Sequence, residues 1–199
     1  AAITAVIGVW KFGQDNRKSR EQRNSEIEAR HEATAVAERE LEWRRANSAQ
    51  QVLEKMEDDE RAADAMLMLD WDGREFTDGN QTWTLTKREI ITALRTSGDA
   101  FSDDEIYVRD AFDHLFWHFE RIQHQIDVGL VTLTHVKFPI GYLMALMEED
   151  RDVFREFLRT YCYDGSLRLW DAFSAQGLPR VQADYERLFN LGNARAAGK

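Results

Sequence analysis

The residues best suited to chemistry lie close together in the middle of the chain. Arg109 is followed five positions later by His114, and the same histidine stands four positions after Asp110 and four before His118. A histidine titrates near neutral pH, so it can accept a proton from a hydroxyl or donate one to a leaving oxygen. An arginine stays charged and binds phosphate through its planar guanidinium group. Arg109 and His114 therefore predict acid–base chemistry on a phosphate ester.

An alternative interpretation uses Asp110, His114 and His118 together. Residues four apart share one side of a helix, and two such histidines with an aspartate can ligate a transition metal. This column predicts a metal-dependent enzyme. However, the sequence contains no H-E-x-x-H pattern, and histidines beside an apolar stripe are usually structural. We therefore expect no cofactor and no metal, and we take Arg109 and His114 as the candidate catalytic residues.

The composition excludes several classes of protein. The chain has 199 residues and a formal net charge of −10, which disfavours a nonspecific binder of duplex DNA. Its one cysteine, Cys162, excludes an internal disulfide framework. Patterns typical of serine hydrolases, P-loop proteins and C-x-x-C zinc sites are absent from the sequence.

The first ten residues, AAITAVIGVW, include eight apolar side chains and no charge. This run is about half of the roughly 20 residues that cross a bilayer. The basic residues that follow, from Lys11 to Arg23, are typical of a cytoplasmic flank. We expect residues 1–12 to be the C-terminal part of a transmembrane anchor in a bacterial inner membrane, with the remainder on the cytoplasmic side. The alternative is a short apolar terminal element that docks on the domain.

Residues 13–58 are predicted to form a long helical stalk. No glycine or proline occurs between Gln14 and Asp72, and the segment is rich in good helix formers. An aspartate in the stretch 57–60 could end this helix by capping a new one. The apolar seam is thin, so both a solvated stalk and a coiled-coil stalk that builds an oligomer stay open. The seam consists of Ile27, Thr34, Leu41, Ala46, Ala49, Leu53 and Met56.

Residues 59–191 are predicted to form an all-α domain with a small hairpin or loop insertion, followed by a tail at 192–199. The first helix ends at Trp71, and the hairpin turns at residues 78–80. Two capping boxes, 86–89 and 102–105, open further helices, the second reaching about Val128. The long helix carries an apolar stripe of Val108, Phe112, Leu115, Phe119, Ile122 and Ile126.

Shorter helices are expected after the long one. The next is predicted to start at Thr132 or Thr134, with Pro139 tolerated in its first turn or at a kink. Three further amphipathic segments, RDVFREFLRTYC, SLRLWDAF and ADYERLFN, complete the domain.

The stretch RDAFDH at 109–114 resembles the catalytic motif of HEPN ribonucleases. That resemblance implies a helical bundle that cleaves RNA without metal, with single-motif copies paired face to face. Residues five apart lie about 140° apart around a helix, so Arg109 and His114 would need a composite site across a dimer to act on one phosphate.

The arrangement of anchor, basic flank, long helix and helical domain extends the resemblance. Residues 42–76 and 107–131 resemble the membrane-anchored HEPN-like accessory proteins of type VI-B CRISPR systems and related uncharacterised bacterial proteins. This implies a homo-oligomeric assembly at the membrane, acting in antiviral defence through RNA or through membrane permeability. The expected partners are a second copy, the membrane and RNA, and no duplex DNA. Two alternatives stay open, a non-enzymatic anchored scaffold and the metal-dependent enzyme.

Overall fold

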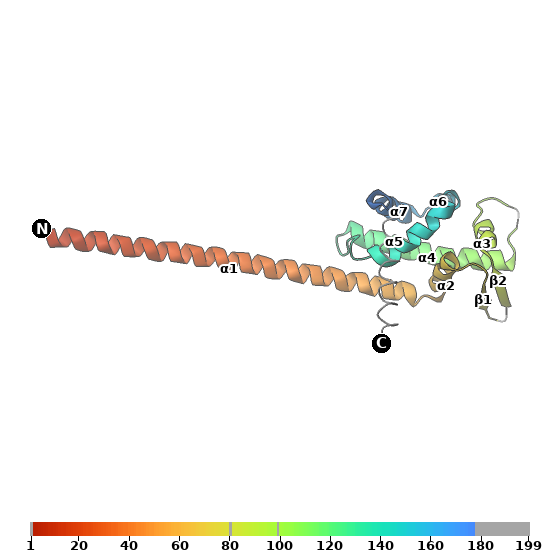
Figure 1. Ribbon diagram of the computed structural model, residues 1–199, viewed down its shortest axis with the longest axis horizontal. Helices are drawn as coiled ribbons and strands as arrows, with labels where there is room; N and C mark the ends of the chain where they lie inside the picture. Colours follow the sequence, from red (N-terminus) through yellow and green to blue (C-terminus); the bar gives the residue numbers. More distant parts are fainter. Residues whose placement is uncertain (1, 80, 99, 178–199) are drawn as a thin grey trace, which may run out of the picture. The chain divides into compact units, whose positions relative to one another are not determined.

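The computed structural model describes residues 2–79, 81–98 and 100–177, with side chains from residue 23 onward. The chain divides into two compact units, residues 1–44 and residues 45–199. Helix α1 (Ala2–Glu57) supplies the first unit and continues into the second (Figure 1). The prediction of a long helix across this region is confirmed.

In the first unit, every side chain from residue 23 to residue 44 is exposed. The exposed fractions of the large apolar side chains there range from 47% at Leu41 to 67% at Trp43. Arg44 and Glu40, one helical turn apart, form an ion pair of 2.5 Å. No helix among the described residues is long and apolar enough to cross a membrane. The partial anchor at 1–12 is shorter than a full span and stays a prediction.

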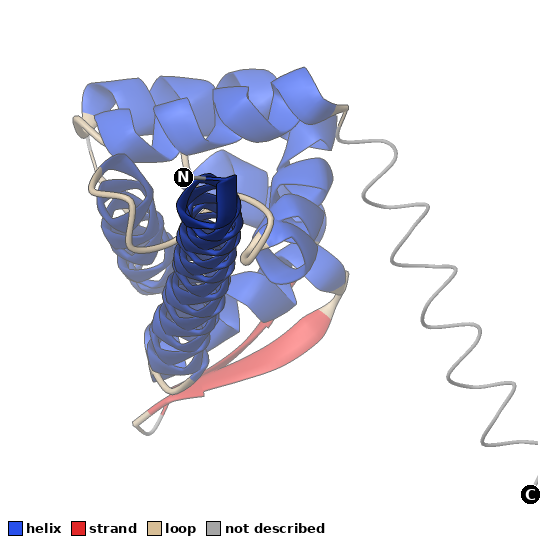
Figure 2. Ribbon diagram, turned by 90° about the vertical axis from the view of Figure 1, so that its left-hand side faces the viewer, coloured by secondary structure: helices blue, strands red, loops and turns tan. Residues whose placement is uncertain are grey.

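The second unit is mostly helical, with one small antiparallel hairpin beside the helices (Figure 2). The predicted all-α class with a small hairpin is thus confirmed. Its elements after α1 are α2 (Glu60–Asp70), β1 (Arg74–Asp78), β2 (Gln81–Leu85), α3 (Lys87–Ala93), α4 (Asp103–Asp127), α5 (Lys137–Met147), the 3-10 turn η1 (Glu148–Asp150), α6 (Arg151–Thr160) and α7 (Asp164–Gln176).

Helix α4 is the central element of this unit, and it contacts α2, α3 and α7. Its first turn is held by the predicted capping box, in which Glu105 accepts a hydrogen bond of 3.0 Å from the Ser102 N–H. The predicted apolar stripe is buried from Val108 to Ile122, and Ile126 is partly buried. Around it the aromatic rings of Phe112, Phe116, Phe154 and Phe157 lie with centroids 5.6–6.5 Å apart.

The hairpin and α3 also follow the sequence closely. β1 pairs with β2 so that Phe76 lies opposite Trp83, and both rings contact Tyr107 of α4. The predicted capping box at 86–89 precedes α3, where the Thr86 N–H donates to the Glu89 carboxylate over 2.8 Å.

Helix α5 starts later than the sequence predicted. It begins at Lys137 rather than at Thr132 or Thr134, so Pro139 falls in the first turn, where a missing N–H costs no helical hydrogen bond. The Thr132 hydroxyl instead pairs with the His135 ring over 2.8 Å in the preceding turn. The predicted helices at 151–162 and 166–173 are present as α6 and α7. The segment 183–190 and the tail at 192–199 lie outside the described residues.

The end of α1 belongs to the helical domain rather than to the stalk. The sequence placed this boundary after residue 58, but the second unit begins at Arg45. Ala49, Val52 and Met56 are buried in the same core as α4. Ala49 and Met56 of the predicted seam therefore face the core of the domain, and burial of these two side chains and Val52 stabilises the packing of the end of α1.

A carboxylate of α4 holds the start of α7. Glu120 accepts a hydrogen bond of 2.6 Å from the Ser166 N–H, and the Ser166 hydroxyl donates to the Phe116 carbonyl over 3.1 Å. The close approach favours glycine at 165, because a Cβ there would lie 2.5 Å from Glu120 Oε2 and the carboxylate would have to shift. An anion at a helix N-terminus satisfies free N–H groups and the helix dipole.

We expect Gly165→Ala to lower the free energy of unfolding by about 1 kcal/mol, because the new methyl group displaces the Glu120 carboxylate from the Ser166 N–H. The usual effect of alanine for glycine within a helix has the opposite sign. Urea unfolding followed by circular dichroism measures the change. In a Glu120→Ala background the same substitution should become neutral or stabilising, and an unchanged loss there would contradict this explanation.

Candidate functional site

Asp59 stands between α1 and α2 and caps the second helix. Its Oδ1 accepts hydrogen bonds from the N–H groups of Arg61 and Ala62 over 3.1 and 3.3 Å. The backbone of Asp59 is extended, as is usual for a residue that caps a helix N-terminus. The sequence-based prediction of an aspartate cap in the stretch 57–60 is confirmed.

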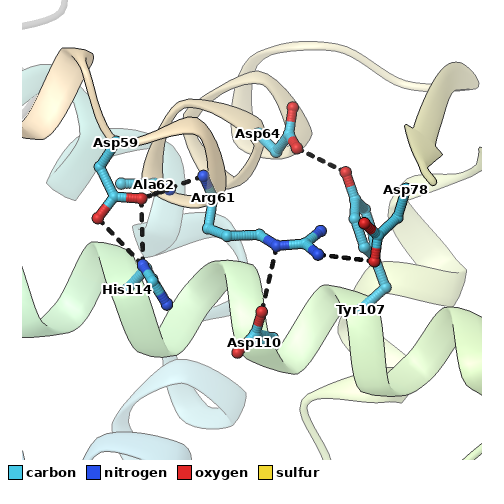
Figure 3. Close-up of polar contacts among 8 residues, drawn as sticks. All are labelled: Asp59, Arg61, Ala62, Asp64, Asp78, Tyr107, Asp110 and His114. Carbon is cyan, nitrogen blue, oxygen red and sulfur yellow. Dashed lines mark hydrogen bonds and ion pairs between the residues drawn. The ribbon is translucent and has the colours of Figure 1, made fainter.

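The same carboxylate binds two histidines of α4. His114 Nδ1 lies 3.0 Å from Asp59 Oδ2, and His118 Nε2 lies 3.0 Å from the same oxygen. Figure 3 shows the His114 ring rising from α4 toward Asp59 at the start of α2. Because His114 and His118 are four residues apart on one side of α4, a single carboxylate between the helices reaches both.

The contact with Asp59 determines which ring nitrogen of His114 carries the hydrogen. An ionised carboxylate only accepts hydrogen bonds, so Nδ1 of His114 must carry the hydrogen that faces Asp59. Nε2 of the neutral ring then has a free lone pair, and it points away from Asp59 in Figure 3. The His114 side chain is 46% exposed, whereas that of His118 is 4% exposed. His114 is therefore the histidine that can exchange a proton with a bound molecule.

Asp59 is strongly acidic in this setting. Partial burial opposes its ionisation, but hydrogen bonds from His114, His118 and the Ala62 N–H outweigh that effect and lower the pKa of Asp59 from 3.8 to about 2. The carboxylate is thus ionised at neutral pH, as an orienting partner of a histidine must be.

A cavity of about 450 Å³ opens beside Asp59 and His114. It is lined by Asp59, Asp110, Asp113, His114, Trp117 and Tyr163. The Tyr163 hydroxyl donates to Asp113 Oδ1 over 3.1 Å. Burial raises the pKa of Asp113 despite that hydrogen bond, and burial together with the Asp113 charge raises the pKa of Tyr163.

Asp110 faces α2 instead of the histidines. Its carboxylate lies 3.2 Å from Arg61 Nε, and Arg61 also binds Asp78 of the hairpin over 2.6 Å (Figure 3). His114 and His118 share Asp59, not Asp110, as their partner. Across residues 2–79, 81–98 and 100–177, no group of three or more histidine, cysteine or acidic side chains is arranged to hold a metal ion. The alternative in which Asp110, His114 and His118 ligate a metal therefore gains no support.

Arg109, the second predicted catalytic residue, contacts other elements of the domain. Its guanidinium donates to the carbonyls of Ala93 and Arg95 over 2.8 and 2.9 Å and also to the Tyr161 hydroxyl. It lies 4.1 Å from the centroid of the Phe101 ring. These contacts tie α4 to the end of α3 and to the α6–α7 connection, so Arg109 and His114 have different hydrogen-bond partners.

The connection between α6 and α7 contacts α4 at two positions, Arg109 and Asp113. Between α6 and α7, Cys162 has a φ of +61°, which turns the chain so that Tyr161 and Tyr163 reach different residues. Tyr161 meets Arg109, and Tyr163 meets Asp113 one helical turn later.

Sequence reasoning identified His114 but missed its partners. The capping pattern placed Asp59 at a helix start, and no pattern indicated that this helix would pack on α4. Trp117 follows His114 by three residues and Asp113 by four, so the spacing of one helical turn was a usable signal that Trp117 lies beside both. Tyr163 carried no signal, because its place depends on the turn at Cys162.

Comparison of the chain with protein-family models, with curated proteins and with solved structures gives no match.

Asp59 makes the free energy of unfolding depend on pH in the acidic range. Its folded-state pKa of about 2 lies below the ordinary value of 3.8, so its contribution is complete above pH 4 and is lost as the pH falls toward 2. We expect Asp59→Asn to flatten the fall in unfolding free energy between pH 4 and pH 2, measured by urea unfolding. Asp58→Asn, which changes an exposed neighbouring carboxylate, is the control and should leave the slope unchanged.

We expect Arg109→Ala to lower the free energy of unfolding by about 2–3 kcal/mol, because two carbonyls lose their donor and Phe101 loses its cation. Thermal or urea unfolding measures the loss. Arg88→Ala, at an exposed position of α3, should change stability by less than about 0.5 kcal/mol. Equal stability of the two variants would show that the Arg109 contacts contribute little to the fold.

Proposed function

We propose that this protein is a metal-independent RNA-cleaving effector in which His114 is the general base and Asp59 orients it. The observation that carries the proposal is the Asp59–His114 hydrogen bond, which leaves Nε2 of a half-exposed imidazole free beside a cavity. A histidine oriented by a carboxylate in this way recurs in enzymes that activate hydroxyl groups. The resemblance of RDAFDH to the HEPN motif supports RNA as the substrate.

In the proposed reaction, His114 Nε2 takes the proton of a ribose 2′-hydroxyl. The 2′ oxygen then attacks the adjacent phosphorus, and the bond from phosphorus to the 5′ oxygen breaks. The leaving oxygen takes a proton from water, so the products are a 2′,3′-cyclic phosphate and a 5′-hydroxyl end. Asp59 stabilises the imidazolium that forms on His114.

The phosphate needs a positive charge, since the chain as a whole carries a net charge of −10. Arg121 meets this need better than Arg109. Its guanidinium lies 4.6 Å from the centroid of the Trp117 ring, which lines the cavity. Within the described part of the chain Arg121 forms no ion pair, whereas Arg109 is engaged by two carbonyls. We therefore assign phosphate binding to Arg121, and the composite Arg109–His114 site across a dimer stays a prediction from the resemblance.

We propose, again on the resemblance, that copies assemble through α1 at the bacterial inner membrane and act in antiviral defence through RNA or membrane permeability. The exposed apolar side chains of α1 support self-association, because four large ones stand in solvent along residues 23–44. They are Ile27, Val36, Leu41 and Trp43, with exposed fractions of 47–67%.

The same exposed side chains favour a second candidate function, a non-enzymatic scaffold in which α1 docks a partner. This function requires no chemistry at His114. It predicts that charge reversals along residues 26–45 change assembly, while substitution of His114 is silent.

The deciding experiment incubates the full chain with labelled single-stranded RNA in EDTA. We expect the wild type to release fragments that end in a 2′,3′-cyclic phosphate, and His114→Ala to lose at least about a hundredfold in rate, the usual range for a general base. Asp59→Asn should lose a smaller factor. His124→Ala, an exposed histidine of the same helix, is the matched control and should cleave as the wild type does.

Cleavage that persists in His114→Ala would exclude the proposed base. Absence of cleavage by the folded wild type would favour the scaffold, and sedimentation of variants with reversed charges in α1 would then test that function directly.

A further inference from the structure

The cavity beside His114 combines features that no catalytic step above uses. Asp113 and Tyr163 form one hydrogen-bonded pair in its wall, and Trp117 forms another part of the lining. Asp113 is partly buried, and only its Oδ1 accepts from Tyr163. Within the described residues no side chain or backbone group donates to its Oδ2. That oxygen can therefore accept a hydrogen bond from a ligand in the cavity.

The carboxylates select for a ligand that donates hydrogen bonds. Asp110 is paired with Arg61, which also binds Asp78, and Asp59 accepts from two histidines and two backbone N–H groups. Asp113 is left as the acceptor that can face a bound group. An exocyclic amino group of a nucleobase is the natural match, since carboxylates accept from cytosine N4 in nucleic-acid complexes.

Trp117 and Arg121 point to a nucleobase rather than to a basic peptide. The Trp117 side chain is 52% exposed beside the cavity, and aromatic side chains of this kind stack on bases. Arg121, stacked on the same ring, adds a cation next to the acidic cavity. That cation attracts the phosphate of a nucleotide. The cavity of about 450 Å³ is large enough for a base and its ribose.

We propose that this cavity binds a nucleobase that carries an exocyclic amino group, with Asp113 as its acceptor, Trp117 as its stacking surface and Arg121 on the adjoining phosphate. The inference rests on the proposed function, because it names the substrate class of the same site. Base recognition of this kind predicts cleavage next to cytosine in preference to uracil, the pyrimidine that presents a carbonyl oxygen in place of the amino group.

Binding is measured without cleavage, so that the two proposals are tested separately. The probes are fluorescent ten-nucleotide strands of 2′-O-methyl cytidine and 2′-O-methyl uridine, which have no 2′-hydroxyl to react. Fluorescence anisotropy with the full wild-type chain should give a dissociation constant about tenfold lower for the cytidine strand, the discrimination expected of one well-placed base contact.

The variant Asp113→Asn gives the sharpest prediction. Its amide oxygen keeps the hydrogen bond from Tyr163, so its NH₂ group faces the cavity and donates instead of accepting. We expect the preference for cytidine to disappear or to invert toward uridine. Asp127→Asn, at an exposed carboxylate near the other end of α4, is the matched control and should keep the wild-type preference. Circular dichroism confirms that both variants are folded.

Arg121→Gln should weaken the binding of both strands by a similar factor and reduce the dependence of affinity on salt, as loss of one phosphate contact does. Equal affinity of the wild type for the two strands would overturn the inference. So would binding of an oligolysine peptide with no binding of either strand. Preferential binding of cytidine without cleavage of RNA would uphold this inference and refute the proposed function, whereas cleavage of both sequences at equal rates would do the reverse.

Discussion

The Asp59 carboxylate is the interaction on which the arrangement of the domain depends. It accepts from two N–H groups at the start of α2 and from two histidines of α4. A partly buried anion needs this many donors, because it loses solvation by water on folding. Satisfying it therefore fixes the start of α2, the packing of α2 on α4 and the tautomer of His114 together. The proposed chemistry uses a geometry that the fold already requires.

Arg109 and His114 lie on different sides of α4 and have different surroundings. On the side that faces α3, Arg109 is held by carbonyls and aromatic rings, which suits a permanent cation that supports structure. On the side that faces α2, His114 meets a carboxylate and a cavity. One helix thus carries a rigid structural arginine and a histidine that can exchange protons. Their separation of about 140° around the helix keeps the two roles apart.

The short connection between α6 and α7 contacts α4 both at Arg109 and beside the cavity. The left-handed backbone at Cys162 allows Tyr161 and Tyr163 to reach Arg109 and Asp113, two residues one turn apart on α4. Glu120 then holds the first turn of α7. The acidic wall of the cavity is therefore positioned by the same contacts that dock α7 on the central helix, which couples the geometry of the cavity to the stability of the fold.

The sequence by itself determined the local elements of this protein. Capping boxes at Thr86 and Ser102 and the apolar stripe of α4 are properties of neighbouring residues, so their helices could be predicted. His114 was also identifiable from its type. Only the tertiary structure decided its partner, because Asp59 is 55 positions away in the sequence and the contact of such distant residues depends on how helices pack. For the same reason, the contacts of Arg109 with the end of α3 and the place of the end of α1 in the domain could not be predicted, and the catalytic role of Arg109 stays a prediction.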